Sequence, residues 1–394
     1  MLLSVAALVV LPWSGLFPAP PAAFAQPAPA VAAPWPATDG PRPIVVDTHA
    51  DTTQRIVYQG ASFLEGIPGA HLDLPKMRAG GLDAQFFSIF VLPKRTPPAA
   101  YFTEAMRQIH AIQALAAGSG GRLAFARTSR EVRANAARNV PSALLGVEGG
   151  HALGVGGEAE QLAHLRQFAT EGVRYMTLTW TNSNPIGGSS GDDGDGRGLT
   201  DFGRRVVDEM QRLGILIDLS HVSDPLFWDA IRYAKKPVIL SHSSARTLAN
   251  VPRNVTDAML RAVARNGGAV CVNYNPAFLD ADYARRQAPL WAAARDLPPE
   301  QVFRSVEEAS AKLPPVPLAR LADHVMHMVT VAGVDHVCLG SDFDGIPSLP
   351  AGLDDASRLP ALTAELRLRG VSAEDLRKLL GGNTLRVMEA SEAR

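Results

Sequence analysis

The sequence has little cysteine and no excess of charge of either sign. Its only two cysteines, Cys271 and Cys338, each lie inside an apolar run typical of a buried strand. This position favours two buried, small hydrophobic side chains over a disulfide bond. Lysine and arginine number 38, and aspartate and glutamate number 39. That balance argues against a nucleic-acid or anionic-membrane surface and suits small polar or zwitterionic partners.

Long apolar runs are also scarce. Residues 1–12 are apolar, but no lysine or arginine precedes them, and Pro12 interrupts the run too early for it to span a bilayer. Ala23-Phe24-Ala25 before Gln26 matches the small-x-small cleavage pattern of a secretory signal peptide. We therefore predict export to the periplasm or the medium, with no stable membrane insertion after cleavage. The predicted parts are a signal peptide over 1–25, a Pro/Ala-rich tether over 26–42 and one domain over 43–394.

From Pro43 onward, short β-rich runs alternate with amphipathic helical patterns. The predicted strands are Ile44–Val46, Ala84–Val91, Ser142–Val147, Arg174–Leu178, Leu216–Leu219, Val238–Leu240, Ala269–Val272 and His336–Leu339. The predicted helices are Thr103–Ala117, Ser129–Ala137, Glu158–Glu171, Asp201–Leu213, Pro225–Ala234, Thr256–Asn266, Leu318–Ala332 and one that begins at Ser372. Such alternation favours a parallel sheet, and eight units favour a closed (β/α)₈ TIM barrel over an open doubly wound sheet.

Two insertions interrupt this pattern. Residues 184–198 are rich in glycine, aspartate and serine but lack the full spacing of a calcium loop, which predicts a mobile loop. Residues 275–313 form a longer, partly helical excursion between the seventh and eighth strands. In a barrel, this excursion would overhang the active face as a lid or a partner surface.

Polar side chains that can bind metal follow five of the predicted strands. They are His49 and Asp51 after the first, Glu148 after the third, His221 after the fifth, His242 after the sixth and Asp342 after the eighth. The carboxyl ends of all strands meet at one face of a barrel. Three imidazoles and three carboxylates that converge there are costly unless they are paired or hold metal. Nitrogen and oxygen ligands suit Zn²⁺, and two ions sharing a carboxylate would serve hydrolysis.

Several motifs in this order resemble those of the membrane (renal) dipeptidase family, a branch of the metal-dependent amidohydrolases. The similarity covers about residues 43–390. The motifs are Asp47-Thr48-His49-Ala50-Asp51, Asp73-Leu74-Pro75, Gly81 with Ala84-Gln85-Phe86, Val147-Glu148-Gly149-Gly150-His151, Arg174-Tyr175-Met176-Thr177-Leu178-Thr179, Asp218-Leu219-Ser220-His221, Ser241-His242-Ser243, Arg253-Asn254 and Ser341-Asp342-Phe343-Asp344-Gly345. The resemblance implies a barrel that holds two zinc ions and cleaves dipeptides.

The resemblance also implies a role for each site residue. One ion would be held by His49, Asp51 and Asp342, the other by His221 and His242, and Glu148 would bridge both. Asp342 would also take the proton of the bridging water and pass it to the leaving amine. Arg253 would bind the C-terminal carboxylate of the substrate, which suits a guanidinium fork.

Three further residues are candidates near this site. Trp180 stands where the family commonly has a histidine that contacts the substrate, so its indole would either line the pocket or donate a weaker hydrogen bond. Tyr274 is a second candidate substrate contact. His151, three residues after Glu148, is a candidate support behind the metal ligands.

Two alternative functions remain open at this point. A cyclic amide or lactone hydrolase of the same superfamily usually shows His-x-His after the first strand and a lysine at the bridging position, whereas this chain has His49-Ala50-Asp51 and Glu148. A non-catalytic binding barrel would have lost ligands, and none is missing. Among partners, a dipeptide is expected and a nucleic acid is not, and a homodimer stays open.

Overall fold

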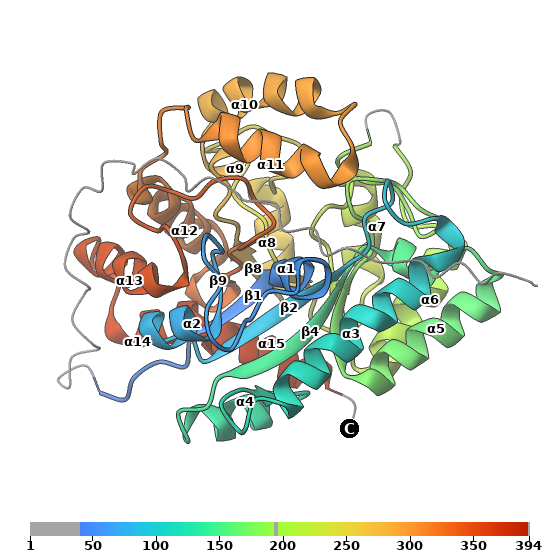
Figure 1. Cartoon of the computed structure of the whole chain (residues 1–394), viewed down its shortest axis with the longest axis horizontal. Helices are drawn as coiled ribbons and strands as arrows, with labels where there is room; N and C mark the ends of the chain where they lie inside the picture. The colour runs from blue at the N-terminus through green and yellow to red at the C-terminus, as the bar shows by residue number, and fades with distance from the viewer. Residues whose placement is uncertain (1–39, 193–195, 393–394) are drawn as a thin grey trace, which may run out of the picture. The chain divides into compact units, whose positions relative to one another are not determined.

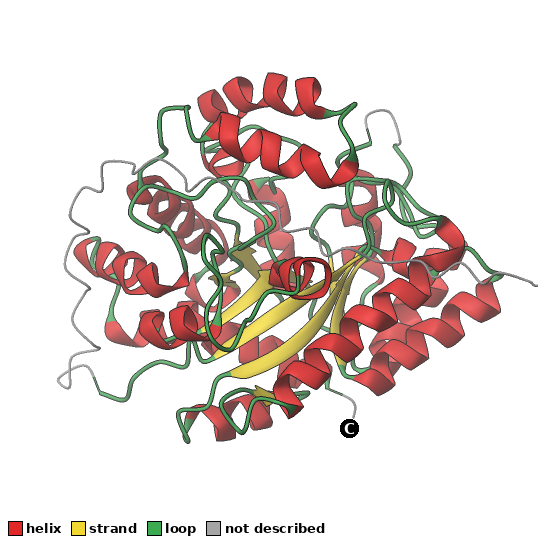
Figure 2. Ribbon diagram, viewed as in Figure 1, coloured by secondary structure: helices red, strands yellow, loops and turns green. Residues whose placement is uncertain are grey.

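Eight parallel strands close into a barrel surrounded by helices in the computed structural model, which describes residues 40–192 and 196–392 (Figures 1 and 2). The barrel strands are β1 (Val46–Ala50), β2 (Ala84–Phe90), β4 (Ser142–Glu148), β5 (Val173–Thr177), β6 (Leu216–Asp218), β7 (Ile239–Leu240), β8 (Ala269–Val272) and β9 (Val337–Leu339). The pairings β1–β9 and β2–β4 close the ring. The predicted (β/α)₈ barrel is confirmed, and the short β3 (Ala124–Phe125) is an unpredicted strand that pairs with β4 beside the ring. The predicted signal peptide and most of the tether lie outside the described residues.

The helices follow the strands around the barrel, as Figure 2 shows. They are α1 (Thr52–Gln59), α2 (Leu74–Gly80), α3 (Tyr101–Ala117), α4 (Ser129–Ala136), α5 (Glu158–Glu171), α6 (Asp201–Leu213), α7 (Asp224–Tyr233), α8 (Asp257–Asn266), α12 (Leu318–Ala332), α13 (Leu359–Leu368), α14 (Ala373–Arg377) and α15 (Asn383–Ser391). Thr256 caps α8, because its side chain accepts the N–H of Met259. No described helix is long and apolar enough to cross a membrane.

Side chains of alternate strand residues fill the interior of the barrel. Val46, Phe86 and Tyr175 are fully buried there, and residues of α15 such as Leu385 pack against the same cluster. Tyr175 fits because it faces Gly146: a Cβ atom on that glycine would lie 1.9 Å from the Tyr175 ring. The barrel is therefore a packed core, and a ligand has access only at its rim.

The two cysteines form a disulfide bond, so the prediction of two unpaired thiols is wrong. Cys271 on β8 and Cys338 on β9 are register partners in adjacent parallel strands, and their sulfur atoms are bonded. Both side chains are fully buried, as the apolar runs predicted. The pairing could not be read from the sequence because 67 residues separate the two positions, and only strand register brings them together.

The excursion between β8 and β9 is helical and lies at the top of Figure 1. It contains α9 (Pro276–Leu279), α10 (Ala281–Ala294) and α11 (Pro299–Ser310). Tyr283 on α10 bonds Ser348 in the loop after β9, with 2.7 Å between the hydroxyl oxygens. His324 on α12 donates its Nε2 proton to the carbonyl of Leu279 over 3.0 Å. The excursion is thus attached to the side of the barrel where the strands end.

The second insertion differs from its prediction as a mobile loop. Asn184, Ile186 and Ser189 are buried, and the backbone N–H of Ser190 donates to the carbonyl of His221 over 2.8 Å. These contacts fasten the described part of the insertion to a predicted site residue.

Candidate metal centre

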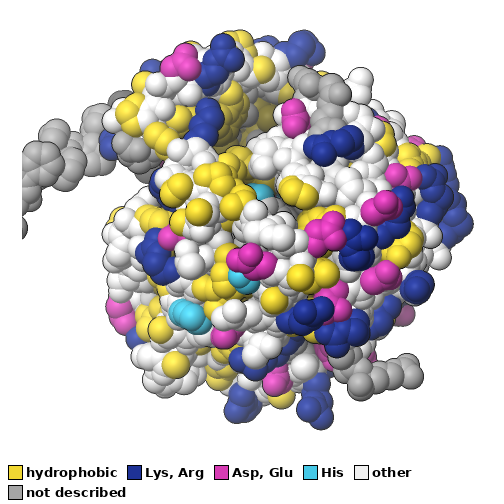
Figure 3. Space-filling view, turned by 90° about the vertical axis from the view of Figure 1, so that its right-hand side faces the viewer, with side chains coloured by type: hydrophobic (Ala, Val, Ile, Leu, Met, Phe, Trp, Pro, Cys, Tyr) yellow, Lys and Arg dark blue, Asp and Glu magenta, His cyan; other side chains and the backbone are white. Residues whose placement is uncertain are grey.

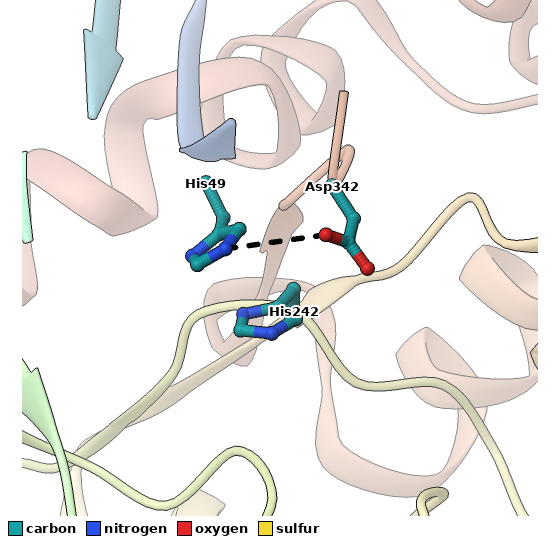
Figure 4. Close-up of side chains that lie close together, drawn as sticks. All are labelled: His49, His242 and Asp342. Atoms are coloured by element: carbon teal, nitrogen blue, oxygen red, sulfur yellow. Dashed lines mark ion pairs between the residues drawn. The ribbon is translucent and has the colours of Figure 1, made fainter. Parts of the chain in front are cut away.

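All six predicted metal ligands meet at the carboxyl ends of the barrel strands. Figure 4 shows three of them, His49, His242 and Asp342, pointing toward one another, with His49 Nε2 4.0 Å from Asp342 Oδ1. Each of the six side chains belongs to a buried residue that is at most 9% exposed. The structure therefore brings together residues that are up to 293 positions apart, His49 and Asp342 being the most distant pair.

Glu148 lies between two groups of these side chains. Its Oε2 atom is 3.7 Å from His49 Nε2, which in turn is 3.4 Å from Asp51 Oδ2. Its Oε1 atom is 2.9 Å from His221 Nε2 and 3.5 Å from His242 Nε2. One carboxylate thus presents each of its oxygens to a different cluster of potential ligands.

The spacing and the unpartnered atoms fit divalent metal ions. Tetrahedral zinc with bonds near 2.0–2.1 Å places neighbouring ligand atoms about 3.3 Å apart, close to the distances around Glu148. His221 Nε2 and His242 Nε2 are only 2.9 Å apart. His49 Nε2 and Asp51 Oδ1 are buried and have no hydrogen-bond partner. Unpaired nitrogen and oxygen atoms that converge in a buried site are stabilised by a cation among them.

The electrostatics of the site show the same need for positive charge. Burial lowers the pKa of His49, but Glu148, Asp51 and Asp342 outweigh it and raise that pKa to about 10. Burial, then Asp51, raises the pKa of the Glu148 carboxyl well above its ordinary value. A bound cation would replace the extra protons that these carboxylates otherwise favour.

The backbone is unusual at two of the six residues. His221 has φ 71° and Asp342 has φ 64°, the left-handed region that residues other than glycine rarely adopt. Each lies three residues after the end of its strand, β6 for His221 and β9 for Asp342, in the turn at the barrel mouth. Gly345 leaves room for the same site, because a Cβ atom there would lie 2.1 Å from Asp51 Oδ2.

Buried residues that the sequence analysis did not single out hold the ligands in place. The Tyr175 hydroxyl is 2.8 Å from Nδ1 of His49. Asn273 donates its side-chain N–H to Asp342 Oδ2 over 2.9 Å. The carboxylate of Asp47 accepts the N–H of Ser341 over 2.7 Å, and it also accepts the Ser341 hydroxyl proton. Only their position in the sequence could have indicated them, because each lies on or directly after a strand that carries a metal ligand or that neighbours such a strand.

Arg253 lies beside the metal-ligand cluster and retains free donors. Its Nη1 donates to Ser243 Oγ over 2.9 Å and its Nη2 donates to the His242 carbonyl over 2.8 Å, whereas its Nε has no partner. Burial lowers the pKa of Arg253 to about 10, against the opposing attraction of Asp342 and Glu148. The guanidinium therefore stays charged at neutral pH and can still bind an anion.

The remaining candidates lie at different places. Trp180 is partly exposed and packs its indole on Phe90, with ring centroids 4.6 Å apart, so it lines the rim of the mouth. Tyr274 is fully buried in the apolar layer outside the strands and packs on Phe343. The preceding residue, Asn273, points toward the site and donates to Asp342, so a contact between Tyr274 and the substrate stays a prediction.

His151 does not bond to the six ligands either. Its Nε2 is 2.8 Å from the Val91 carbonyl, its Nδ1 has no partner, and its ring packs edge-on against Tyr101. Its proximity to Gly149, whose added Cβ would lie 2.3 Å from the ring, shapes the end of β4. The predicted support of a ligand by His151 is therefore not seen.

The comparisons with known proteins agree with this geometry. The family model described as membrane dipeptidase (peptidase family M19) matches residues 41–394. An uncharacterized dipeptidase of Schizosaccharomyces pombe (strain 972 / ATCC 24843) is 35% identical over 368 residues, which cover 88% of this chain and 80% of that protein. A metallo peptidase from Rhodobacter sphaeroides, solved with a phosphinate mimic of the dipeptide L-Ala-D-Ala, superposes with a TM-score of 0.75 at 28% identity, covering 89% of this chain and all of that one.

A further solved structure supports the fold alone. The probable dipeptidase PvdM from Pseudomonas aeruginosa has a TM-score of 0.77 at 23% identity, covering 89% of this chain and 96% of that one.

Proposed function

The chain belongs to the membrane dipeptidase family and is a metallo-dipeptidase, and from that premise we propose that it hydrolyses dipeptides with two zinc ions. The proposed ligands are His49, Asp51 and Asp342 for one ion, His221 and His242 for the other, and Glu148 for both. The observation that carries this proposal is the position of Glu148, whose Oε2 atom faces His49 and whose Oε1 atom faces His221. A carboxylate in that position suits a bridging ligand.

The zinc ions, when bound, would supply an activated water at neutral pH and polarise the scissile carbonyl. The protein's own side chains then bind the substrate and move the proton. Asp342 is buried, and Asn273 fixes its Oδ2 atom, so Oδ1 is the oxygen left facing the site. Burial raises the pKa of Asp342, which suits a group that takes up a proton and returns it to the leaving amine. Arg253 would bind the substrate carboxylate, which restricts cleavage to the C-terminal peptide bond.

The test is hydrolysis of a dipeptide panel by the purified protein, with tripeptides and N-acylated amino acids as controls. We expect dipeptides to be cleaved, activity to disappear on removal of metal with a chelator, and activity to return with about two equivalents of zinc. Equal cleavage of tripeptides and dipeptides would contradict the proposed substrate, and activity that survives complete metal removal would contradict the proposed zinc site.

We also propose that the protein is exported, with a mature chain that begins near Gln26. The disulfide between Cys271 and Cys338 supports this, because structural disulfides persist mainly in oxidising compartments. Sequencing the N-terminus of the protein from its native host tests the proposal, and a retained Met1 in a cytosolic fraction would contradict it.

A further inference from the structure

A buried carboxylate, a hydroxyl and an imidazole form a chain of hydrogen bonds behind the metal centre. Asp218, the last residue of β6, is fully buried, and its Oδ1 accepts the backbone N–H groups of Ser220 and Ser241, each over 2.9 Å. Its Oδ2 atom accepts the hydroxyl proton of Ser241. The same Ser241 oxygen is 2.7 Å from Nδ1 of His242.

Counting protons along this chain assigns the tautomer of His242. Three donors point at Asp218, which favours the ionised carboxylate. The only proton of the Ser241 hydroxyl then goes to Asp218, so the oxygen can only accept from its other neighbours, which are Nδ1 of His242 and, 3.4 Å away, the Ser220 hydroxyl. Nδ1 of His242 must therefore carry a proton, and Nε2 is left with its lone pair. Nε2 is the atom that lies 3.5 Å from Glu148 Oε1.

We infer that Asp218 and Ser241 are positioning residues that hold His242 as the Nδ1–H tautomer, so that Nε2 is always available to a metal ion. The inference rests on the proposed function only in assigning His242 as a ligand. Metal-bound histidines are commonly oriented by a carboxylate or a carbonyl at the other ring nitrogen, and here a serine hydroxyl transmits the carboxylate's effect.

The other two imidazoles of the site lack this arrangement. His49 Nδ1 meets the Tyr175 hydroxyl, and His221 Nδ1 is buried without a partner. The chain from Asp218 is thus specific to His242 among the three.

The decisive variant is Asp218→Asn, which keeps the shape but reverses the polarity of the chain. The amide oxygen can still accept the two backbone N–H groups, which turns the amide N–H toward Ser241 Oγ. That hydroxyl is then free to donate to Nδ1 and favours the tautomer with its proton on Nε2, which cannot bind metal. Reversing a buried carboxylate in this way is known to trap a histidine in the wrong tautomer. Ser241→Ala breaks the chain but leaves both tautomers accessible.

Asp47 offers a matched control for the loss of a buried carboxylate. It accepts the N–H and the hydroxyl of Ser341 just as Asp218 accepts those of Ser241, and it is 1% exposed. Neither the Asp47 carboxylate nor the Ser341 hydroxyl is hydrogen-bonded to an imidazole nitrogen. Asp47→Asn therefore reports the structural cost of the substitution without a change in the tautomer of His242.

Two measurements test the inference. In the metal-free protein, ¹⁵N chemical shifts of the histidine rings show which nitrogen is protonated, and the spectrum of His242→Gln identifies the signals of His242. We expect Nδ1 of His242 to be protonated in the parent and in Asp47→Asn. We expect Nε2 to be protonated in Asp218→Asn, and a mixture of the two tautomers in Ser241→Ala. A parent with its proton on Nε2, or an unchanged tautomer in Asp218→Asn, would overturn the inference.

The second measurement is zinc affinity by chelator competition. Loss of a group that orients a metal ligand costs about 10- to 100-fold in affinity. We expect Asp218→Asn to weaken one of the two zinc ions by that factor and more than Ser241→Ala does, although it is the more conservative change. If Ser241→Ala is equally or more damaging, Asp218 acts only through packing. Because the tautomer is measured without metal, a parent that binds no zinc would refute the proposed function and leave that test intact.

Discussion

Replacing Arg253 by methionine should remove the preference of the enzyme for a free C-terminal carboxylate. The Arg253 guanidinium donates one hydrogen bond to Ser243 and one to the His242 carbonyl. Its Nε and its remaining N–H groups are available to the substrate. Loss of one member of a buried charge pair costs about 2–5 kcal/mol. At about 1.4 kcal/mol for each factor of ten, this corresponds to a loss of about 30- to 4,000-fold in kcat/KM. Because Arg253 is partly exposed, we expect the lower end of that range.

The assay measures kcat/KM for a dipeptide and for its C-terminal amide, in the parent and in Arg253→Met. The four values form a double-mutant-type cycle, in which one change is in the protein and the other is in the substrate. If Arg253 binds the carboxylate, the parent should strongly prefer the free acid and the variant should treat both substrates almost alike. Arg253→Lys keeps the charge without the fork and should lie between them. Metal content must be equal in all three proteins, since Arg253 also contacts the His242 carbonyl. A variant that still prefers the free acid by the parent's factor would refute the assignment.

Three further predictions concern metal, specificity and stability. Glu148→Gln should lose one or both metal ions in elemental analysis, because one carboxylate oxygen of Glu148 faces His49 and the other faces His221; a variant with two ions and full activity would contradict this. Trp180→Phe should keep kcat and KM close to the parent, because the indole packs on Phe90 as a wall; a fall of about 10²–10³ in kcat would instead identify an oxyanion donor, and Trp180→His would then be expected to restore activity. Burial lowers the pKa of His324 to about 4, so the unfolded chain takes up a proton first as the pH falls below about 6.5, and the folded state should lose up to about 3 kcal/mol of stability between there and pH 4. Urea unfolding of the parent and of His324→Gln across this range checks the sign, because the variant should lack that part of the pH dependence.

The barrel and the metal cluster were predictable from local patterns. Runs such as Ile44–Val46 and Ala269–Val272 are apolar on both faces, as strands covered by helices must be. The polar residues that follow them, Glu148 and His221 among them, break that pattern where a strand ends. Parallel strands in a closed ring end at one face, so topology alone brings these residues together without knowledge of any contact.

The elements that were missed carry weaker local signals. α1 begins at Thr52 with two threonines and no side-chain cap, so it resembles a continuation of the strand before it. β3 is only two residues long and depends on β4 for its pairing. The disulfide, and the inward turn of Asn273 in place of Tyr274, depend on the register of β8, which a one-residue shift would reverse.

The residues that support the ligands show why the identity of the ligands is easier to predict than their orientation. Asp47 and Ser341 are 294 positions apart, and Asp218 and Ser241 are 23 apart, yet both pairs join the ends of neighbouring strands by the same two hydrogen bonds. In each pair, the serine directly precedes a proposed metal ligand: Ser341 precedes Asp342, and Ser241 precedes His242. Asp342 adopts a left-handed backbone conformation that costs roughly 1–2 kcal/mol outside glycine. The bonds from Asp47 to the preceding serine offset that cost and fix the turn. The sequence therefore shows which side chains can bind metal, whereas their orientation is set by pairs that only the closed barrel brings into contact.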